Sequence, residues 1–373
     1  MCFKFDVDFQ QKYYRNMISR ELWDKNRPKN NPFLNYQFLN ALIQSQSVGT
    51  ETGWTPSIVK NEDEGLLLSF IKNHSYGEYI FDWGWAEAYQ KYGIPYYPKL
   101  TSMIPFTPAT TQHFLLKEFN YDQASQLLNK HDELYEKGNF SSSHFLFLTP
   151  EEISVFQNHN YMIRESMQYH FFNKNYKSFE DFLSNLKTKK AKNIRHERDI
   201  PDVVIRQYTG DELTEAHAER MYQFYISTIV NKHSHDYLNK DFFVLIFQNM
   251  KESILYAEAS VNDKPIAGSL FFYDHEKLYG RYWGSTLHVD NLHFELCYYQ
   301  GIDFCIKNKL DVFEAGAQGE HKIARGFRPI RTYSAHKIKH PGFHTAISEF
   351  IENEKKQIAY SIDKLSDYLP FKV

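Results

Sequence analysis

A run of polar residues near the carboxyl end of the chain has the composition of a catalytic loop. Between Phe313 and His336, the sequence places two carboxylates, two histidines, several cations and three glycines. Glu314, at the end of an expected strand, is a candidate to accept a proton from an attacking amine, directly or through water. His321 is an alternative base because its ordinary pKa lies near neutrality. Glu320, in the first turn of a short expected helix, is a third candidate.

The same loop carries groups that bind anions or polar substrates. Arg325 or Arg331 can hold a phosphate or a carboxylate through paired hydrogen bonds. Tyr333 and His336 end the run and are predicted to contact substrate. The sequence is equally compatible with a glycine-capped turn whose polar face is solvated, because perturbed environments are not visible in it.

A second group of candidates lies in the first half of the chain. Asp82 and Trp83 are expected at the end of a strand, Lys99 follows in a segment rich in Tyr and Pro, and Arg164 and His170 follow a short helix. An indole beside cationic side chains suits a sugar, or a peptide with a terminal carboxylate. The alternative is an ordinary aromatic core with Asp82 and Lys99 at the surface. For each of these residues taken alone, this alternative is favoured, because charged side chains are usually exposed.

A basic segment between the two halves is a candidate for contact with a polyanion. Lys189, Lys190 and Lys192 fall among six cations within residues 187–198. Such a cluster can contact phosphates, for instance those of an RNA, and makes binding depend on salt. A linker helix with a solvated basic face has the same pattern and is the slightly favoured alternative.

Composition limits the class of protein. The chain has 373 residues, of which 42% are hydrophobic and 24% charged, as in soluble globular proteins. This length exceeds one ordinary core, so two domains are expected. The formal net charge of −3 provides no global field that would attract nucleic acid. Binding of a polyanion therefore requires a local basic patch.

Metal, cofactor and targeting signals are weak. Cys2, Cys297 and Cys305 form no disulfide framework and no paired metal motif. The cluster at residues 233–236 has histidines too close together for a standard zinc site. The first residues lack the apolar segment of a signal peptide, and no apolar run is long enough for a membrane span. We expect a cytoplasmic protein with no metal and no tightly bound cofactor.

The pattern of apolar residues predicts alternating helices and strands. Helices are expected around residues 38–43, from a capping box at 149–152, from 178 to before Pro201, after Asp211, and at 292–307. A strand-rich block at 54–106 includes 66–71 and 76–85. Further strands are expected at 144–148, 253–259, 266–273, 278–285 and 311–315.

The two halves repeat a similar order of elements. The residues from Tyr76 to Gly84 match those from Tyr279 to Gly284 in the placement of Tyr, Gly and Trp, which favours two similar units. We expect a first domain at residues 1–177, a basic linker helix at 178–200, and a second, catalytic domain at 201–373.

The order helix, three-stranded meander, helix, strand, helix, strand is that of the GNAT acyltransferase fold. Two such units joined by a basic helix resemble the Fem family of peptidoglycan peptide-bridge transferases, and more closely the FemAB-like group labelled peptidoglycan biosynthesis/recognition. The resemblance rests on segments between about residues 31 and 340 of the sequence. They lie at residues 31–34, 48–56, 74–83, 96–100, 105–108, 314–322 and 332–336.

This resemblance implies an α/β (α+β) fold of two tandem GNAT-like units, each a mixed, mostly antiparallel sheet flanked by helices. It implies an acyl- or aminoacyl-transferase acting on an amine, with a peptidoglycan-precursor peptide as acceptor and acyl-CoA or aminoacyl-tRNA as donor. Backbone amides between the strand ending at Ser285 and the strand with Glu314 are then expected to hold the oxyanion.

Two alternatives remain open. One is a peptidoglycan-peptide recognition module without catalysis, and the other is a CoA-dependent N-acetyltransferase acting on another amine. One departure from the GNAT pattern bears on the donor. The glycine-spaced loop that binds the pyrophosphate of acetyl-CoA is absent from residues 282–290.

Overall fold

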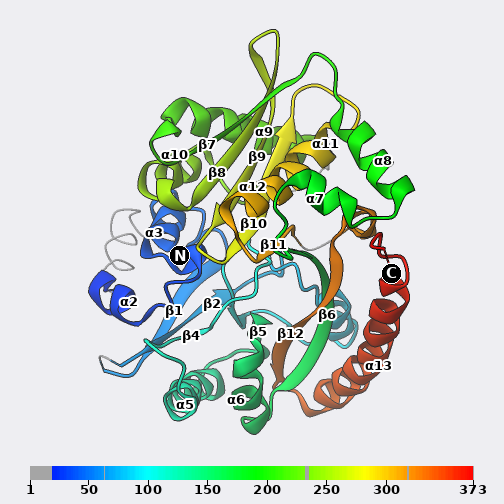
Figure 1. The fold of residues 1–373 in the computed structure, drawn as a ribbon. Coiled ribbons are helices and arrows are strands. Elements are labelled where there is room, and N and C mark those ends of the chain that lie inside the picture. The colour runs from blue at the N-terminus through cyan, green and yellow to red at the C-terminus, as the bar shows by residue number, and fades with distance from the viewer. Residues whose placement is uncertain (1–18, 63, 232–234, 317–318, 373) are drawn as a thin grey trace. The chain divides into compact units, whose positions relative to one another are not determined.

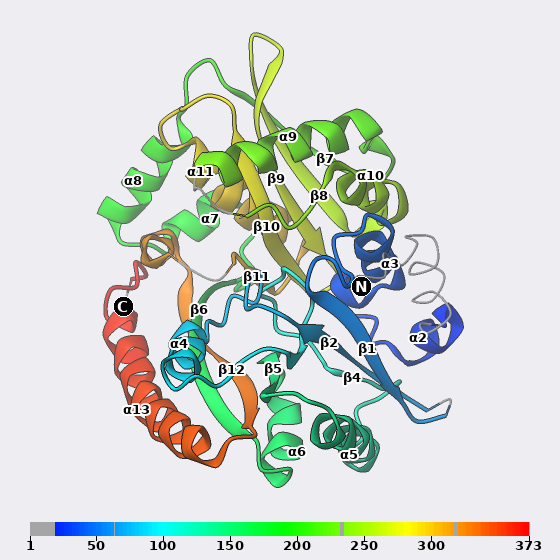
Figure 2. The same ribbon diagram turned by 180° about the vertical axis from the view of Figure 1, so that it is seen from behind.

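The computed structural model describes residues 19–62, 64–231, 235–316 and 319–372, and Figures 1 and 2 show it from opposite sides. Contacts group the chain into two compact units, and neither is continuous in sequence. Unit 1 comprises Met1–Ser166 and Arg331–Ala359. Unit 2 comprises Met167–Ile330 and Tyr360–Val373.

Unit 1 is built on strands in the order β1-β2-β3-β5-β12. β1, β2 and β3 are antiparallel neighbours, β5 is parallel to β3, and β12 is antiparallel to β5. The short β4 adds a second partner to β2. The strands are β1 (Trp54–Lys60), β2 (Leu66–Lys72), β3 (Lys99–Ser102), β4 (Phe114–Leu115), β5 (Ser142–Leu148) and β12 (Arg328–Ile338).

The helices of unit 1 follow local sequence signals. Asn35 caps α3 by accepting a hydrogen bond from the Gln37 backbone, and the apolar stripe of that helix is buried. The expected capping box at Thr149 and Glu152 is present. The helices are α2 (Arg20–Asn26), η1 (Pro32–Leu34), α3 (Tyr36–Gln44), α4 (Trp83–Lys91), α5 (Tyr121–Lys137), η2 (Pro150–Glu152), α6 (Ile153–Asn158) and α13 (Pro341–Ser366), the last of which ends in unit 2.

Unit 2 has strands in the order β6-β11-β10-β9-β8-β7. β7, β8, β9 and β10 form an antiparallel meander, β11 is parallel to β10, and β6 is antiparallel to β11. The strands are β6 (Met162–Phe172), β7 (Val204–Thr209), β8 (Ile254–Val261), β9 (Lys264–Tyr273), β10 (Lys277–Ser285) and β11 (Val312–Glu314).

The helices of unit 2 pack on this sheet. A Cβ at Gly284 of β10 would lie 1.6 Å from the Phe224 carbonyl oxygen, so the close packing of α9 on β10 requires glycine there. The helices are α7 (Phe179–Ser184), α8 (Thr188–Arg198), η3 (Gly210–Glu212), α9 (Glu215–Asn231), α10 (Lys240–Asn249), η4 (Lys251–Ser253), α11 (Leu292–Phe294), η5 (Glu295–Tyr299), α12 (Gln300–Asn308) and η6 (Glu320–Arg325).

The two sheets share one order of pairings. In each, two antiparallel pairings lead to a parallel pairing and then to a last antiparallel strand. The predicted fold class, a mixed and mostly antiparallel sheet flanked by helices in each unit, is confirmed.

The last strands of the two halves are exchanged along the sequence. β6 ends the first half of the chain, and its residues from Phe172 back to His170 pair with β11 of unit 2. β12 ends the second half, and its residues from Tyr333 to Ile338 pair with β5 of unit 1. The compact units therefore differ from the expected domains at residues 1–177 and 201–373, because a boundary drawn along the sequence cannot follow an exchange of strands.

Two local expectations differ from the structure. The segment 76–81 lies between β2 and α4 and is not a strand, since Gly77 and Tyr79 have positive φ angles of 81° and 62°. It therefore does not correspond to Tyr279–Gly284, which lie within β10. The helix expected from 178 to before Pro201 consists of two helices, α7 and α8, separated by residues 185–187.

Other expectations concern the cysteines, metal ligands and membrane-spanning helices. Cys297 is half-buried and Cys305 is buried, whereas Cys2, His233 and Ser234 lie outside the described residues. Within the described ranges, we find no group of three or more His, Cys, Asp or Glu arranged to hold a metal ion. In the same part of the chain, no helix combines the length and the apolar character needed to cross a bilayer.

Candidate active site

The unit 2 sheet brings three polar side chains together at its parallel pair of strands. Lys277 begins β10, and Glu314 ends the neighbouring β11. Glu314 pairs with Tyr279, so Glu314, Tyr279 and Lys277 lie on one face of the sheet. His170 on β6 lies directly opposite Glu314. We call Lys277, Glu314 and His170 the unit 2 trio.

Glu314 is 3% exposed, and among the described residues only one of its two oxygens has a hydrogen-bond partner. Oε1 accepts a hydrogen bond from Lys277 Nζ at 3.3 Å. Oε2 lies 4.0 Å from His170 Nε2 and has no hydrogen-bond partner among the described residues. Buried carboxylate oxygens are usually hydrogen-bonded, so this free oxygen marks Glu314 as a group able to receive a proton.

The environment of His170 keeps its ring neutral. Burial lowers the pKa of His170, and the nearby Glu314 carboxylate only partly opposes this effect. Its Nε2 lies 3.3 Å from the Gln168 side-chain oxygen. The unit 2 trio therefore places the Glu314 carboxylate between one cation and one neutral imidazole.

The short helix η6 contacts the segment that follows β11. Gly316 and Gly319 have φ angles of 82° and 116°, which allow the turn into η6. Buried Lys322 donates to the Gly316 carbonyl at 3.1 Å, and burial lowers its pKa to about 8. His321 Nε2 lies 2.8 Å from the Tyr298 hydroxyl, and burial together with neighbouring cations lowers the pKa of His321. His321 thus remains a candidate base within this loop.

The surroundings of Arg325 and Glu320 do not match the roles predicted for them. The Arg325 guanidinium makes two hydrogen bonds to the Glu197 carboxylate, at 2.8 and 3.0 Å, and lies 3.5 Å over the Phe294 ring. The guanidinium is buried and its charge is paired with Glu197, which argues against the predicted role in binding an anion. Glu320 is exposed and lines a separate hollow with Lys190, which argues against its role as a base.

Ser285 and Glu314 are not brought together. The ladder between β10 and β11 ends at Tyr279 and Glu314, six residues before Ser285, a separation of about 20 Å along a strand. The Ser285 hydroxyl donates to the Ile266 carbonyl at 3.1 Å. Backbone amides of β10 just beyond Tyr279 lie nearer to Glu314 than the predicted oxyanion donors at Ser285.

Unit 1 places three polar side chains at the equivalent strand positions. Lys99 begins β3, as Lys277 begins β10. His144 is the third residue of β5, and Glu314 is the third residue of β11. His336 on β12 lies directly opposite His144. We call Lys99, His144 and His336 the unit 1 trio. Of these, His144 was not predicted from the sequence.

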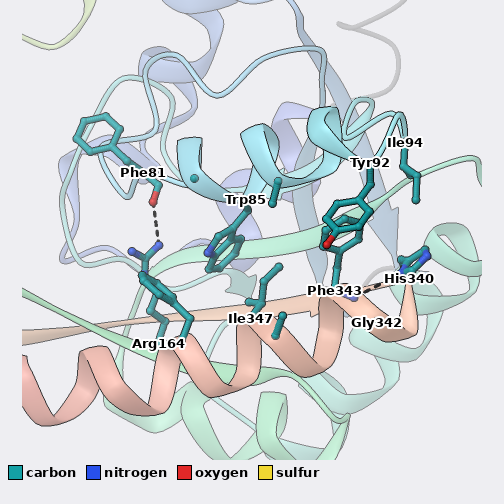
Figure 3. Close-up of a pocket in the computed structure, with 13 residues that line it drawn as sticks. Phe81, Trp85, Tyr92, Ile94, Arg164, His340, Gly342, Phe343 and Ile347 are labelled. Carbon is teal, nitrogen blue, oxygen red and sulfur yellow. Dashed lines mark hydrogen bonds between the residues drawn. The ribbon is translucent and has the colours of Figure 1, made fainter.

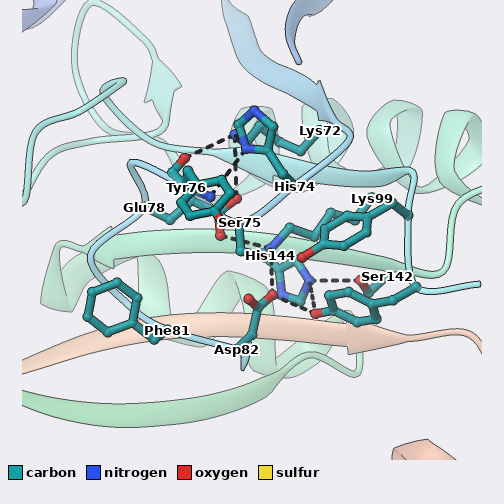
Figure 4. A network of polar contacts seen from close by, with 12 residues as sticks. Lys72, His74, Ser75, Tyr76, Glu78, Phe81, Asp82, Lys99, Ser142 and His144 are labelled. Carbon is teal, nitrogen blue, oxygen red and sulfur yellow. Dashed lines mark hydrogen bonds and ion pairs between the residues drawn. The ribbon is translucent and has the colours of Figure 1, made fainter. Parts of the chain in front are cut away.

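Buried ion pairs surround Lys99, as Figure 4 shows. Its Nζ lies 2.5 Å from Asp82 Oδ2 and 2.8 Å from Glu78 Oε2, and it also donates to the Ser75 hydroxyl at 2.8 Å. A second lysine, Lys72, lies 3.9 Å from Glu78 Oε1. All four charged groups are buried, so the alternative that Asp82 and Lys99 are surface residues is wrong.

The four groups titrate differently because their partners differ. Burial opposes ionisation of Asp82, but the Lys99 ammonium outweighs it and holds the pKa of Asp82 well below its usual range. Burial likewise opposes the charge on Lys99, but the two carboxylates outweigh it and raise the pKa of Lys99. Burial raises the pKa of Glu78 to about 7 and lowers that of Lys72 to about 6. The pair of Lys99 and Asp82 therefore carries the fixed charges.

A chain of hydrogen bonds links this cluster to the histidines. The Tyr96 hydroxyl donates to Asp82 Oδ2 at 2.6 Å and lies 3.3 Å from His144 Nε2. His144 Nδ1 and His336 Nδ1 are 2.7 Å apart, so one ring donates and the other accepts. Burial lowers the pKa of His144 to about 3 and that of His336 well below its usual value. Both rings are neutral at pH 7.

Trp83 and Arg164 lie at the edge of this region. Trp83 is half-buried between Tyr76 and Phe81, with ring centroids 5.0 and 6.2 Å away. The Arg164 guanidinium makes two hydrogen bonds to Glu354, at 2.6 and 2.8 Å, which argues against its predicted role in binding a substrate carboxylate.

Tyr333 is set apart from the unit 1 trio. It pairs with Leu148 at the other end of the β5–β12 ladder from His336, and its side chain packs against a hydrophobic core. The structure therefore gives Tyr333 no contact with the polar cluster that contains Lys99.

The basic helix α8 is only partly available to a ligand. Lys189 and Lys192 are exposed and Lys190 is half-buried. Arg195 and Arg198 form ion pairs with Glu180 and Glu295, respectively. Two of the six cations are thus neutralised within unit 2.

Several residues of both sites carry no sequence signal of their own. Lys277 is an ordinary lysine after a turn, and His144 lies in an apolar strand. Their importance comes from strand register, which becomes visible only when equivalent strands of the two units are aligned. Lys72 and Glu78 were missed for a different reason: a charged residue in a strand-rich block is usually exposed.

Comparisons with known proteins were made for the sequence and for the fold. Residues 15–373 match the FemAB-like family, described as peptidoglycan biosynthesis/recognition. No curated protein matches the sequence. Three solved structures are similar in fold at low sequence identity.

The crystal structure of FemX has a TM-score of 0.54 at 9% identity, covering 93% of this chain and 99% of that one. The C-terminal domain of a putative lysylphosphatidylglycerol synthetase from Agrobacterium fabrum has a TM-score of 0.52 at 8% identity, covering 93% and 97%. A conserved protein of unknown function from Bacteroides thetaiotaomicron has a TM-score of 0.50 at 14% identity, covering 90% and 98%. At such identities these likenesses concern the fold alone.

The family match, in contrast, is one of sequence and extends over almost the whole chain. The chain belongs to the FemAB-like family of peptidoglycan biosynthesis/recognition proteins.

Proposed function

We propose that this protein transfers an acyl or aminoacyl group to an amine, and that the amine belongs to a peptidoglycan-precursor peptide. The family description supports the link to peptidoglycan, and the fold shared with FemX agrees with a transferase. The observation that carries the proposal is Glu314, a buried carboxylate with one oxygen held by Lys277 and the other without a hydrogen-bond partner in the described ranges of the chain.

In the proposed reaction, the amine nitrogen forms a bond to the acyl carbon of the donor, and the bond from that carbon to the leaving group breaks. The amine proton passes to Glu314 Oε2. Lys277 holds the carboxylate in place through Oε1, and the neutral His170 adds no competing charge. Backbone amides of β10 beyond Tyr279 are the proposed donors to the oxyanion that develops on the acyl group.

The test is the replacement Glu314→Gln in a transfer assay. The acceptor is a synthetic peptide with a free lysine side-chain amine, and the donors are acetyl-CoA, a long-chain acyl-CoA and aminoacyl-tRNA. Loss of a general base lowers kcat by about 10²- to 10⁴-fold. Glu219→Gln is the matched control, since Glu219 is a half-exposed carboxylate of the same unit, paired with Lys240. Full turnover in Glu314→Gln would remove this assignment.

The donor is proposed to be acyl-CoA or aminoacyl-tRNA, bound only during turnover. Lys189 and Lys192 offer exposed positive charge to a polyanionic donor. Reversing the charges of Lys189, Lys190 and Lys192 then weakens binding of aminoacyl-tRNA and flattens its salt dependence. Micromolar affinity for acetyl-CoA that survives this triple replacement supports instead an N-acetyltransferase acting on another amine.

One observation favours a second function, recognition without catalysis. Tyr76 and Phe81 are 41% and 44% exposed and flank Trp83 in unit 1, as in surfaces that bind sugar rings or peptides. Calorimetry with muropeptide fragments separates the two functions. Saturable binding without transfer from any of the three donors supports a recognition module.

A further inference from the structure

Unit 1 contains a pocket that the proposed transfer reaction does not use. It has a volume of about 650 Å³, within the range of sites for small ligands. Figure 3 shows it between α4 and the first turns of α13, with Trp85 and Ile347 projecting into it. The pocket lies wholly within unit 1 and apart from the unit 2 trio.

The wall of the pocket is apolar, and its rim exposes large side chains. Trp85, Phe343 and Ile347 are buried in the wall. Phe81, Tyr92 and Phe350 stand at the rim and are 44%, 76% and 47% exposed. Rings of this size in contact with water around an apolar cavity indicate a surface that a ligand covers.

The buried polar group of the wall, the Arg164 guanidinium, is already partnered. Besides its two hydrogen bonds to Glu354, the Arg164 guanidinium donates to the Phe81 carbonyl at 2.9 Å, as Figure 3 shows. Within the described part of the chain, none of the lining residues has a buried side-chain nitrogen or oxygen without a partner. Between Trp85 and Ile347, a sugar or peptide would lose hydrogen bonds to water without replacing them, whereas a hydrocarbon chain loses none.

The shape and the charge of the pocket define the ligand further. One side is formed by Gly84, Trp85 and Ala88 of α4, a helix of nine residues and about 13 Å in length. At one end lie His340 and Gly342, at the start of the 26-residue helix α13, whose first turn contains no acidic residue. His340 Nδ1 accepts from the Phe343 amide at 3.4 Å, so Nε2 carries the ring proton. A helix N-terminus beside a histidine favours an anionic head group.

We infer that this pocket binds a single-chain amphiphile with a carboxylate head, that is, a fatty acid. The hydrocarbon chain lies between α4 and α13 against Trp85 and Ile347. The carboxylate lies at the end formed by His340 and the start of α13. This inference does not depend on the proposed transferase function, because it uses no residue of the unit 2 trio.

The test uses the full-length protein and dodecanoate below its micellar concentration, followed by calorimetry and by tryptophan fluorescence. We expect saturable binding to one site, with a change in emission that Trp85→Phe removes. Ala346→Trp places an indole in the pocket from the exposed face of α13 and weakens binding at least about tenfold. Thr345→Trp is the matched control, since Thr345 is exposed on the same turn but does not line the pocket.

Head-group specificity provides the second measurement. Dodecanol is expected to bind about two- to fivefold more weakly than dodecanoate, and dodecyltrimethylammonium more weakly still. Equal binding of all three would mean unspecific partition into an apolar surface and would overturn the inference. So would undiminished binding to a folded Ala346→Trp variant. Failure of dodecanoate to bind, together with a dimer that Ala346→Trp dissociates, would assign the surface to a second copy of the chain.

Discussion

The two units differ in what they do with the same three strand positions. In unit 1, Asp82 and Glu78 surround Lys99 and the two histidine rings bond to each other, although Asp82 Oδ1 and Glu78 Oε1 have no hydrogen-bond partner among the described residues. In unit 2, the strand position of His144 holds a carboxylate, Glu314, whose Oε1 binds Lys277 and whose Oε2 has no hydrogen-bond partner in the described part of the chain. Two similar strand arrangements thus hold different chemical groups at equivalent positions, a neutral imidazole in unit 1 and a carboxylate in unit 2.

The two units also differ in how far the parallel pairing of strands extends beyond each trio. In unit 1, β3 ends at Ser102, and Thr111 pairs with Leu148 of β5 further along. In unit 2, β11 ends at Glu314 while β10 continues to Ser285. The parallel pair is thus extended by another segment in unit 1, whereas in unit 2 it ends at the candidate base.

The largest expected effect concerns the ion-pair network around Lys99. Lys99→Met leaves Asp82 and Glu78 buried without their cation, and is expected to lower the free energy of unfolding by about 3–5 kcal/mol at pH 7. Urea denaturation measures this change. Lys72→Met is the control within the same network: with a pKa of about 6, Lys72 is mostly neutral at pH 7, so its loss removes only hydrogen bonds, about 1 kcal/mol. Equal losses in the two variants would contradict this account of the network.

A smaller effect concerns pH. The folded state holds His144 neutral, with a pKa near 3 against about 6.5 when unfolded. Its stabilising contribution is therefore complete above pH 6.5 and is lost as the pH falls toward 3, by up to about 1.4 kcal/mol per pH unit. Replacement His144→Gln should flatten the loss of unfolding free energy between pH 6.5 and 4. The exposed His275 supplies the control, His275→Gln, for which we expect the wild-type slope.

The smallest effect on stability is expected at the corresponding lysine of unit 2. Lys277 is 32% exposed, so Lys277→Met should change the free energy of unfolding by no more than about 1 kcal/mol. The turnover should nevertheless fall about tenfold, because Glu314 Oε1 loses the hydrogen bond that holds the carboxylate in place. In the Glu314→Gln background, Lys277→Met should change the turnover little. A further fall of about tenfold in that background would show that Lys277 does not act through Glu314.

The sequence predicted the elements better than it predicted their connections. Helix caps and apolar stripes act between neighbours in the chain, so α3, the capping box at Thr149 and the strands β8, β9, β10 and β11 were predicted correctly, whereas β6 and β7 were not predicted. The segment 76–81 was misjudged because its aromatic residues resemble a strand, whereas Gly77 and Tyr79 turn the backbone.

The candidate site was predicted in part. Glu314, Asp82 and Lys99 were singled out by residue type and place, and the structure surrounds each of them with polar or charged groups. Lys277 and His144 could not be found, because only the register of paired strands brings them to these positions. Arg325 and Arg164 have the chemistry of anion ligands, but the carboxylates that occupy them lie more than 100 residues away in sequence.

The exchange of β6 and β12 has a consequence for how the chain is made. The sheet of unit 1 gains its last strand only when residues 333–338 have been synthesised, almost 190 residues after β5. Until then, the emerging first half exposes the unpaired edge of β5, an edge open to association with other chains. Proteins with such long-range pairings fold slowly. An isolated fragment of residues 1–177 would carry the same open edge and would retain β6 without its partner strand.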